Sequence, residues 1–76
     1  MKIVYTKHAL RDKLPTLKRL GWNISKKKIR ETVLNPKWKG MSRHGQETVM
    51  SLVDESHILR VVLRRENDII TVITLH

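Results

Sequence analysis

The chain has 76 residues, of which 16 are Lys or Arg and 7 are Asp or Glu, so its formal net charge is +9. This length allows one small domain, residues 1–76, and excludes a second. The sequence has no cysteine, which excludes disulfides and thiolate metal sites. A charge of this density repels itself within a fold, so it favours an external polyanion: a nucleic acid, an acidic protein or a membrane surface.

The first eight residues have neither the apolar run nor the small-residue cleavage site of a signal peptide. No apolar stretch of the sequence approaches the roughly 18 residues of a membrane span. We therefore expect a soluble, cytoplasmic protein with no membrane partner.

Residues 6–20 have the pattern of an amphipathic helix. Leu10, Leu14 and Leu17 recur at spacings of four and three, with basic residues between them. Pro15 lies inside this segment and cannot donate a backbone hydrogen bond. The sequence therefore predicts a basic-faced helix that is kinked or divided near Leu14.

A second helix is predicted to follow the stop signal at Gly21. Ser25 is a suitable N-cap, and Ile29 and Val33 supply a buried stripe. Residues 35–36, Asn-Pro, end the helix because a residue before proline avoids the helical conformation. Three lysines at positions 26–28 crowd its first turn, and we interpret them as a solvated charge run or as a contact to an anionic partner.

Beyond Gly45 the hydrophobic period changes to two. Residues 46–54, 57–65 and 69–75 each alternate and are rich in β-formers, which predicts three antiparallel strands joined by hairpins. Two-residue loops would place one set of side chains on the face that the helices cover. That set is Thr48, Met50, Leu52, Leu59, Val61, Leu63, Ile70, Val72 and Thr74.

The opposite face of this sheet is expected to carry Arg60 and Arg64 among valines and isoleucines. Guanidinium groups there suit phosphates, and the apolar rows suit bases or the side chains of a partner. The alternative is a face covered by an oligomer partner or by a further segment.

Five motifs in this order resemble a known family, the small domains of unknown function number 4258, which are grouped with the RelE-like toxins. The motifs span nearly the whole chain: Thr6-Lys7-His8-Ala9, Gly21-Trp22-Asn23-Ile24-Ser25, Asn35-Pro36, His57-Ile58-Leu59-Arg60-Val61-Val62 and Ile69-Ile70-Thr71-Val72-Ile73-Thr74. The resemblance implies an α+β fold in which a short N-terminal strand and two helices precede a curled antiparallel sheet of three strands, with both helices on one face. It also implies a metal-independent endoribonuclease, or a non-catalytic relative that binds RNA or an antitoxin-like protein.

Metal-free RNA cleavage needs a base, an acid and cations around the phosphate. The resemblance marks His8 as the catalytic candidate, and a histidine near a helix start titrates near neutral pH. Arg11 and Arg60 would hold the phosphate, with Arg11 in place of the family's Arg at the position where this chain has Asp12. The alternative for His8 is a structural hydrogen bond at the helix start. The other histidines have no regular spacing, so we expect neither a metal site nor a cofactor.

Residues 37–45 form the longest predicted loop, in which basic side chains alternate with an indole. Trp38 would stack on a base while Lys37, Lys39 and Arg43 contact phosphates. Arg64 extends this nucleic-acid-binding set on the sheet. The alternative for Trp38 is a cover over the edge of the core, and Trp22 is expected to seal the helix junction.

Taken together, the sequence predicts a small basic RelE-like domain that binds RNA, with metal-independent endoribonuclease activity. The alternative is a non-catalytic interaction protein that binds an acidic, antitoxin-like partner through salt-sensitive contacts. Homo-oligomerisation is compatible with either hypothesis.

Overall fold

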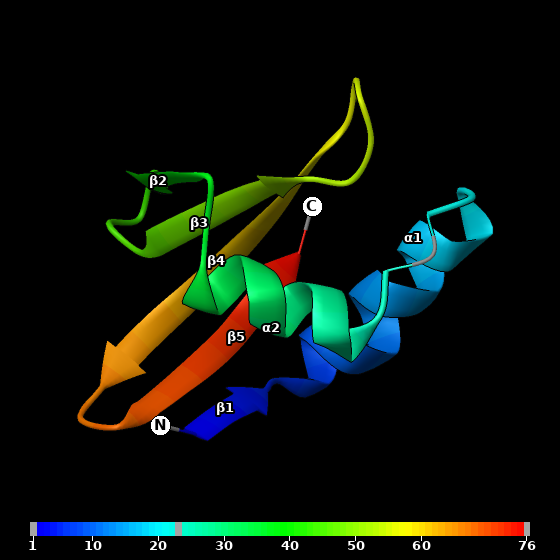
Figure 1. Ribbon diagram of the computed structural model, residues 1–76. Coiled ribbons are helices and arrows are strands. Elements are labelled where there is room, and N and C mark those ends of the chain that lie inside the picture. Colours follow the sequence, from blue (N-terminus) through cyan, green and yellow to red (C-terminus); the bar gives the residue numbers. More distant parts are fainter. Residues whose placement is uncertain (1, 23, 76) are drawn as a thin grey trace.

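A computed structural model describes residues 2–22 and 24–75 of the chain (Figure 1). Asn23, part of the motif at residues 21–25, and His76, one of the histidines not expected to bind a metal, lie outside these ranges. The elements follow in the order β1 (Lys2–Tyr5), η1 (His8–Lys13), α1 (Leu14–Arg19), α2 (Lys26–Leu34), β2 (Trp38–Met41), β3 (Glu47–Leu52), β4 (Ile58–Glu66) and β5 (Ile69–Leu75).

The sheet is mixed and has five strands in the order β1-β5-β4-β3-β2. β1 pairs with β5 in parallel, and the other neighbouring strands are antiparallel. The predicted fold, an antiparallel sheet of three strands after two helices, is therefore wrong. The chain between β1 and β5 contains both helices and strands β2 to β4, so β5 can lie beside β1 in the parallel sense.

The additional strand β2 lies within residues 37–45, which were predicted to be a loop. A tight turn makes the β2–β3 hairpin, because the Ser42 N–H donates to the Gln46 carbonyl at 2.8 Å and Gly45 adopts a φ of 76°. In the strand itself, a Cβ added to Gly40 would meet Thr48 Oγ1 at 3.2 Å. Gly40 thus permits close pairing of β2 with β3 within the stretch that was predicted to be a loop.

The first helix is continuous but changes its hydrogen-bond pattern at Leu14, as Pro15 predicted. η1 is a π-helical segment, in which the Leu14 N–H donates to the Ala9 carbonyl. α1 then begins with Pro15 in its first turn. Because proline supplies no N–H to the carbonyl four residues earlier, the wider turn before it removes that conflict.

The second helix has the predicted limits. Ser25 is its N-cap and accepts a hydrogen bond from the Lys28 N–H at 3.2 Å, and the helix ends at Leu34 before Asn35 and Pro36. Ile29 and Val33 are buried, at 0% and 2% exposure. The hydrophobic pattern and both termini of α2 were therefore readable from the sequence.

The core lies between α2, η1 and one face of the sheet. Its buried members are Ala9, Ile29, Val33, Val49, Leu59, Val61, Leu63, Ile70, Val72 and Leu75. The prediction for β4 was correct at Leu59, Val61 and Leu63, and for β5 at Ile70 and Val72.

The predicted face of β3 was wrong by one residue. Val49, not Met50, pairs with Val61 in the core, and Met50 pairs with Arg60 on the other face. The connection between β3 and β4 is longer than a two-residue hairpin, and the Val53 N–H closes it on the His57 carbonyl at 2.9 Å. A shift of one residue in the register moves every side chain of a strand to the opposite face.

An irregularity also changes the end of β5. Leu63 pairs with Val72 whereas Val62 pairs with Thr74, so one extra residue, Ile73, is accommodated in β5. This bulge turns Leu75 into the core and places Thr74 on the other face, contrary to the predicted alternation.

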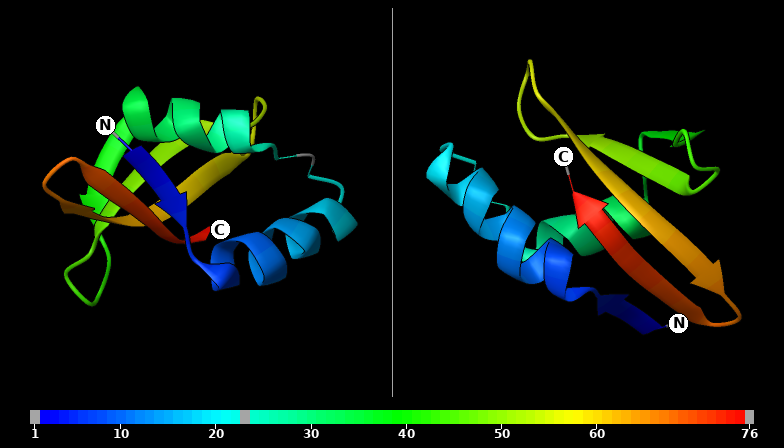
Figure 2. Two further views of the ribbon diagram at one scale, coloured as in Figure 1. Left: turned by 90° about the horizontal axis from the view of Figure 1, so that it is seen from below. Right: turned by 180° about the vertical axis from the view of Figure 1, so that it is seen from behind.

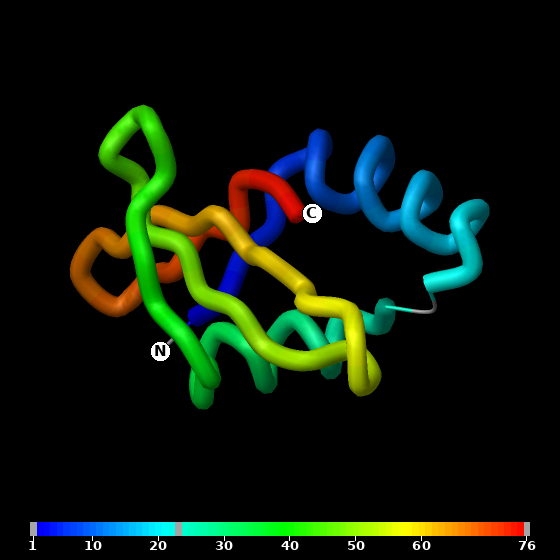
Figure 3. The backbone as a smooth tube through the Cα atoms, turned by 90° about the horizontal axis from the view of Figure 1, so that it is seen from above, coloured from blue at the N-terminus to red at the C-terminus, as the bar shows by residue number. Residues whose placement is uncertain are grey.

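The two helices contact different parts of the sheet. α2 packs on β3 and β4, and η1 contacts β5 where β1 has ended. The Thr6 hydroxyl fixes that junction by donating to the Ile73 carbonyl at 2.8 Å. Seen from above, the strands run between α2 and the η1–α1 helix (Figure 3). Seen from behind, β4 and β5 face the viewer with η1–α1 beside them and α2 beyond (Figure 2, right).

Candidate nucleic-acid interface

The sheet surface turned away from α2 carries a row of side chains from three neighbouring strands. Trp38 of β2 pairs with Met50 of β3, and Met50 pairs with Arg60 of β4. Directly opposed residues share a face, so this register places the three on one side of the sheet. We call this surface the open face and define it by Trp38, Met50, Ile58, Arg60, Val62 and Arg64.

The open face combines two exposed arginines with an apolar residue between them. Arg60 and Arg64 are exposed, whereas Val62 between them is only 4% exposed. The two arginines are four residues apart on one strand, a separation of about 13 Å at the Cα atoms. Arg64 Nε lies 3.0 Å from Glu66 Oε1. In the described part of the chain, Arg60 has no ion pair or side-chain hydrogen bond, so its guanidinium is free to meet a phosphate.

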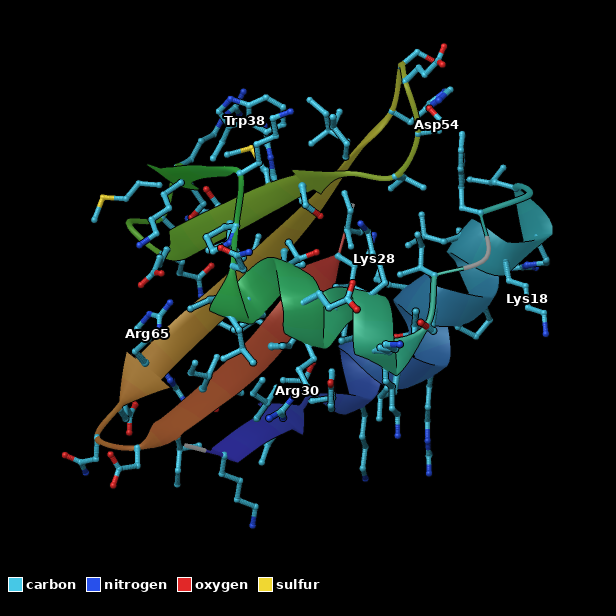
Figure 4. All side chains as sticks on the ribbon, viewed as in Figure 1. Lys18, Lys28, Arg30, Trp38, Asp54 and Arg65 are labelled. Atoms are coloured by element: carbon cyan, nitrogen blue, oxygen red, sulfur yellow. The ribbon has the colours of Figure 1, made fainter. Side chains whose placement is uncertain are left out.

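Trp38 lies on the outermost strand of the sheet (Figure 4), and 41% of it is exposed. Lys37 Nζ lies 5.3 Å from the centroid of its indole ring. An indole that is partly exposed beside a cation can accept a stacked base. This exposure does not support the alternative prediction that Trp38 covers the edge of the core.

The structure separates the other members of the predicted nucleic-acid-binding set. Lys39 pairs with Val49 and therefore lies on the opposite face of β2 from Trp38. Arg43 is exposed in the β2–β3 turn. The predicted loop clamp is thus corrected to a sheet surface in which Trp38, Arg60 and Arg64 share a face.

The catalytic candidates do not form one cluster. His8 begins η1, and its Nδ1 lies 3.1 Å from Asp12 Oδ2, with 53% of its side chain exposed. Arg11 is exposed on the same helix. No hydrogen bond or ion pair of the described residues joins His8 or Arg11 to Arg60. The contact with Asp12 is the structural hydrogen bond that was the alternative for His8.

Sequence reasoning missed a second cluster, which lies in the β3–β4 connection. The Asp54 carboxylate, at the tip of the β3–β4 connection (Figure 4), accepts from the Ser56 N–H at 2.9 Å and lies 2.9 Å from His57 Nδ1. The Ser56 N–H and the His57 side chain hold the pKa of Asp54 below its ordinary value. The Trp22 and His57 rings are 4.1 Å apart between centroids, at 50°.

This aromatic pair borders a small pocket of about 100 Å³. Its lining is Leu17, Trp22, Ile24, Val53, His57, Ile58 and Leu59. Trp22 was predicted to seal the helix junction, and in the structure its ring lies against His57 of the β3–β4 connection. The Asp54-x-Ser56 spacing could have indicated the turn, whereas the contact between Trp22 and His57 crosses the chain and has no local signal.

A wider groove of about 500 Å³ runs along α2 and includes Lys27, Lys28, Arg30 and Ser51. It lies on the helix side of the molecule, away from the open face. The predicted charge run of the first turn therefore lines a solvent-filled groove.

Among the described residues there is no group of three His, Asp or Glu side chains able to hold a metal ion. Likewise, no helix in that part of the chain has the length and apolarity needed to cross a bilayer. Comparison of the chain with protein-family models, with curated proteins and with solved structures finds no match.

Proposed function

We propose that the protein binds single-stranded RNA on the open face. The observation that carries this proposal is the cross-strand row of Trp38, Met50 and Arg60, with Arg64 on the same face. α2 packs on β3 and β4 from the other side of the sheet, and Arg60 and Arg64 are both exposed. A base can stack on the indole while the guanidinium groups bind phosphates.

Stacking on Trp38 favours the binding of a single strand over that of a duplex. Stacking on an aromatic side chain contributes about 1 to 3 kcal/mol per base and requires a base that is not already paired in a helix. The net charge of +9 adds a sequence-independent attraction that weakens with salt. Met50 and Val62 are the apolar residues of the open face that a neighbouring, unpaired base would lie over.

Binding is tested by fluorescence anisotropy of a labelled oligouridylate over a salt series, with wild type, Arg60→Gln and Arg30→Gln. Arg30 is an exposed arginine on α2, so both variants lose one positive charge but only one of them changes the open face. Arg60→Gln should weaken binding about tenfold, because it removes a charge-assisted hydrogen bond. Its log–log salt slope should fall by about 0.7, the value for one single-strand phosphate contact.

Arg30→Gln should change the affinity much less than Arg60→Gln. Equal losses in the two variants would show that only net charge attracts the RNA and would refute the open face as the site. A duplex of matching sequence should bind more weakly than the single strand.

Metal-independent cleavage is the further prediction attached to His8. The same mixtures are held in EDTA, and the RNA is analysed for fragments. If bound RNA is cut, His8→Ala should abolish cutting and leave the affinity nearly unchanged, because a general base acts in the chemical step rather than in binding. Fragments produced equally by His8→Ala would remove His8 from the catalytic candidates.

A further inference from the structure

The pocket beside the Trp22–His57 pair has the composition of a small aromatic binding site. Leu17 and Ile24 supply aliphatic walls, and the two rings meet at 50°. Binding pockets of small ligands are mostly apolar with few polar groups that fix orientation. Here His57 is the titratable side chain of the lining.

The contacts of His57 determine which of its nitrogens can accept a hydrogen bond. Nδ1 lies 2.9 and 3.2 Å from the two oxygens of Asp54. A carboxylate only accepts, so in the neutral ring Nδ1 carries the proton and donates it to Asp54. Nε2 then keeps its lone pair, and it makes no hydrogen bond to the described residues.

The size and position of the pocket restrict its occupant. An apolar cavity of roughly 150 Å³ holds benzene, so a pocket of about 100 Å³ that is open to solvent can take one six-membered ring in part. Ile58 belongs both to the pocket lining and to the open face, two residues from Arg60. The pocket is therefore continuous with the surface proposed to hold RNA.

We infer that this pocket binds a nucleobase that carries a ring N–H, with the base packed against Trp22 and its N–H donated to His57 Nε2. The base is supplied as a free nucleoside or by an RNA strand seated on the open face, and the second source rests on the proposed function. Asp54 acts as a positioning residue because it fixes the tautomer of His57.

The test is an NMR titration of the intact chain with uridine and, in parallel, with 3-methyluridine. Uridine has an imino N–H, and the methylated nucleoside lacks it at the same position. Uridine should shift the Trp22 indole and His57 ring signals, and 3-methyluridine should bind about tenfold more weakly, the factor for the loss of one hydrogen bond. Equal affinities, or shifts confined to other residues, would overturn the inference.

The tautomer is measured in the same samples from long-range proton–nitrogen correlations of the His57 ring. A proton on Nδ1 is the expected result, and a neutral ring protonated on Nε2 would refute the proposed contact. His57→Phe keeps an aromatic ring and removes the acceptor, so it should abolish the preference for uridine. His44→Phe, in the exposed β2–β3 turn, is the matched control and should retain it. If His57→Phe does not fold, the comparison of the two nucleosides on wild type still decides.

Oligouridylate separates the two sources of the base. Shifts at His57 that require Arg60, and so disappear in Arg60→Gln at the same RNA concentration, assign the pocket to a strand on the open face. Uridine binding without oligouridylate binding would support the pocket as a nucleoside site and refute the proposed function. Oligouridylate binding that leaves His57 and Trp22 unshifted would refute the pocket inference and leave the proposed function standing.

Discussion

Two threonine hydroxyls with opposite hydrogen bonding show how single polar atoms affect the stability of this small core. Thr32 Oγ1 donates to the Lys28 carbonyl at 2.8 Å and lies 2.6 Å from Ser51 Oγ, so it links α2 to β3. Thr74 Oγ1 is buried and has no hydrogen-bond partner among the described residues. An unsatisfied buried hydroxyl costs about 1 to 3 kcal/mol.

Thr74→Val should therefore raise the free energy of unfolding by about 1 kcal/mol, because it removes a buried hydroxyl that makes no hydrogen bond. Thr32→Val is the matched change and should lower it by about 1 to 2 kcal/mol, because it also orphans Ser51. Urea denaturation followed by circular dichroism measures both. A loss of stability in Thr74→Val equal to that in Thr32→Val would indicate that the Thr74 hydroxyl has a partner.

Asp54 makes stability depend on pH in the acid range. Its pKa is lowered in the folded chain by the Ser56 N–H and the His57 side chain, from an ordinary value of 3.8. A lowered carboxyl pKa contributes stability above the unfolded pKa, and this contribution is lost as the pH falls through the folded pKa.

Wild type should therefore be more stable than Asp54→Asn at higher pH. This difference in stability should disappear as the pH falls below about 3.8. Thermal unfolding of both proteins over a pH series measures the difference. A difference that stays constant down to the lowest pH would show that the charge of Asp54 is not responsible.

Among the elements, the β2–β3 hairpin depends on one backbone conformation. Gly45 has a φ of 76°, in the region where side chains other than those of Asn and Asp are strained. β2 is an edge strand and all four of its residues are exposed. The β2–β3 hairpin therefore gains little stability from burial of β2 side chains, and strain in the turn would not be compensated.

Gly45→Ala should lower the free energy of unfolding by about 1 to 2 kcal/mol and speed amide hydrogen exchange in β2 more than in β4. Because Trp38 is carried by β2, RNA affinity should fall as well. Gly45→Asn should retain most of both properties, since Asn tolerates the left-handed region. Unchanged exchange in β2 would mean that the turn does not control the hairpin.

At the scale of the whole molecule, the net charge of +9 acts on stability and on binding in opposite directions. Self-repulsion between cations destabilises the folded chain, and salt screens it over a Debye length of about 10 Å at 0.1 M. The same screening weakens attraction to RNA. The excess charge therefore reduces stability while it promotes binding.

The melting temperature of the free protein should rise with sodium chloride over the range in which its affinity for RNA falls. Scanning fluorimetry and anisotropy in shared buffers check the two trends. A melting temperature that falls with salt would show that specific ion pairs, such as Arg65 with Glu47 at 2.9 Å, outweigh the repulsion.

Features that depend on local interactions were predicted correctly, and features that depend on long-range contacts were not. Residues 25–36 predicted α2 correctly, because a cap, an apolar stripe and a helix stop are local signals. Pro15 likewise predicted the change at Leu14. Thr48 and Met50 were assigned to the wrong face, because their side depends on the length and closure of the β3–β4 connection. The hypothesis that His8 and Arg60 act together required two residues distant in the chain to lie close in space, and no local pattern specifies such a contact.

By itself, the sequence determined the charge, the helix limits, the identity of most core residues in β4 and β5, and the arginines opposite them. These properties follow from composition and from periods of two and 3.6 residues, which the backbone imposes on any segment. Only the tertiary structure decided that β1 pairs with β5, that Trp38, Met50 and Arg60 form one row, and that Trp22 meets His57. Each of these joins residues that are distant in the chain, and strand register and packing rather than local propensity choose between the alternatives.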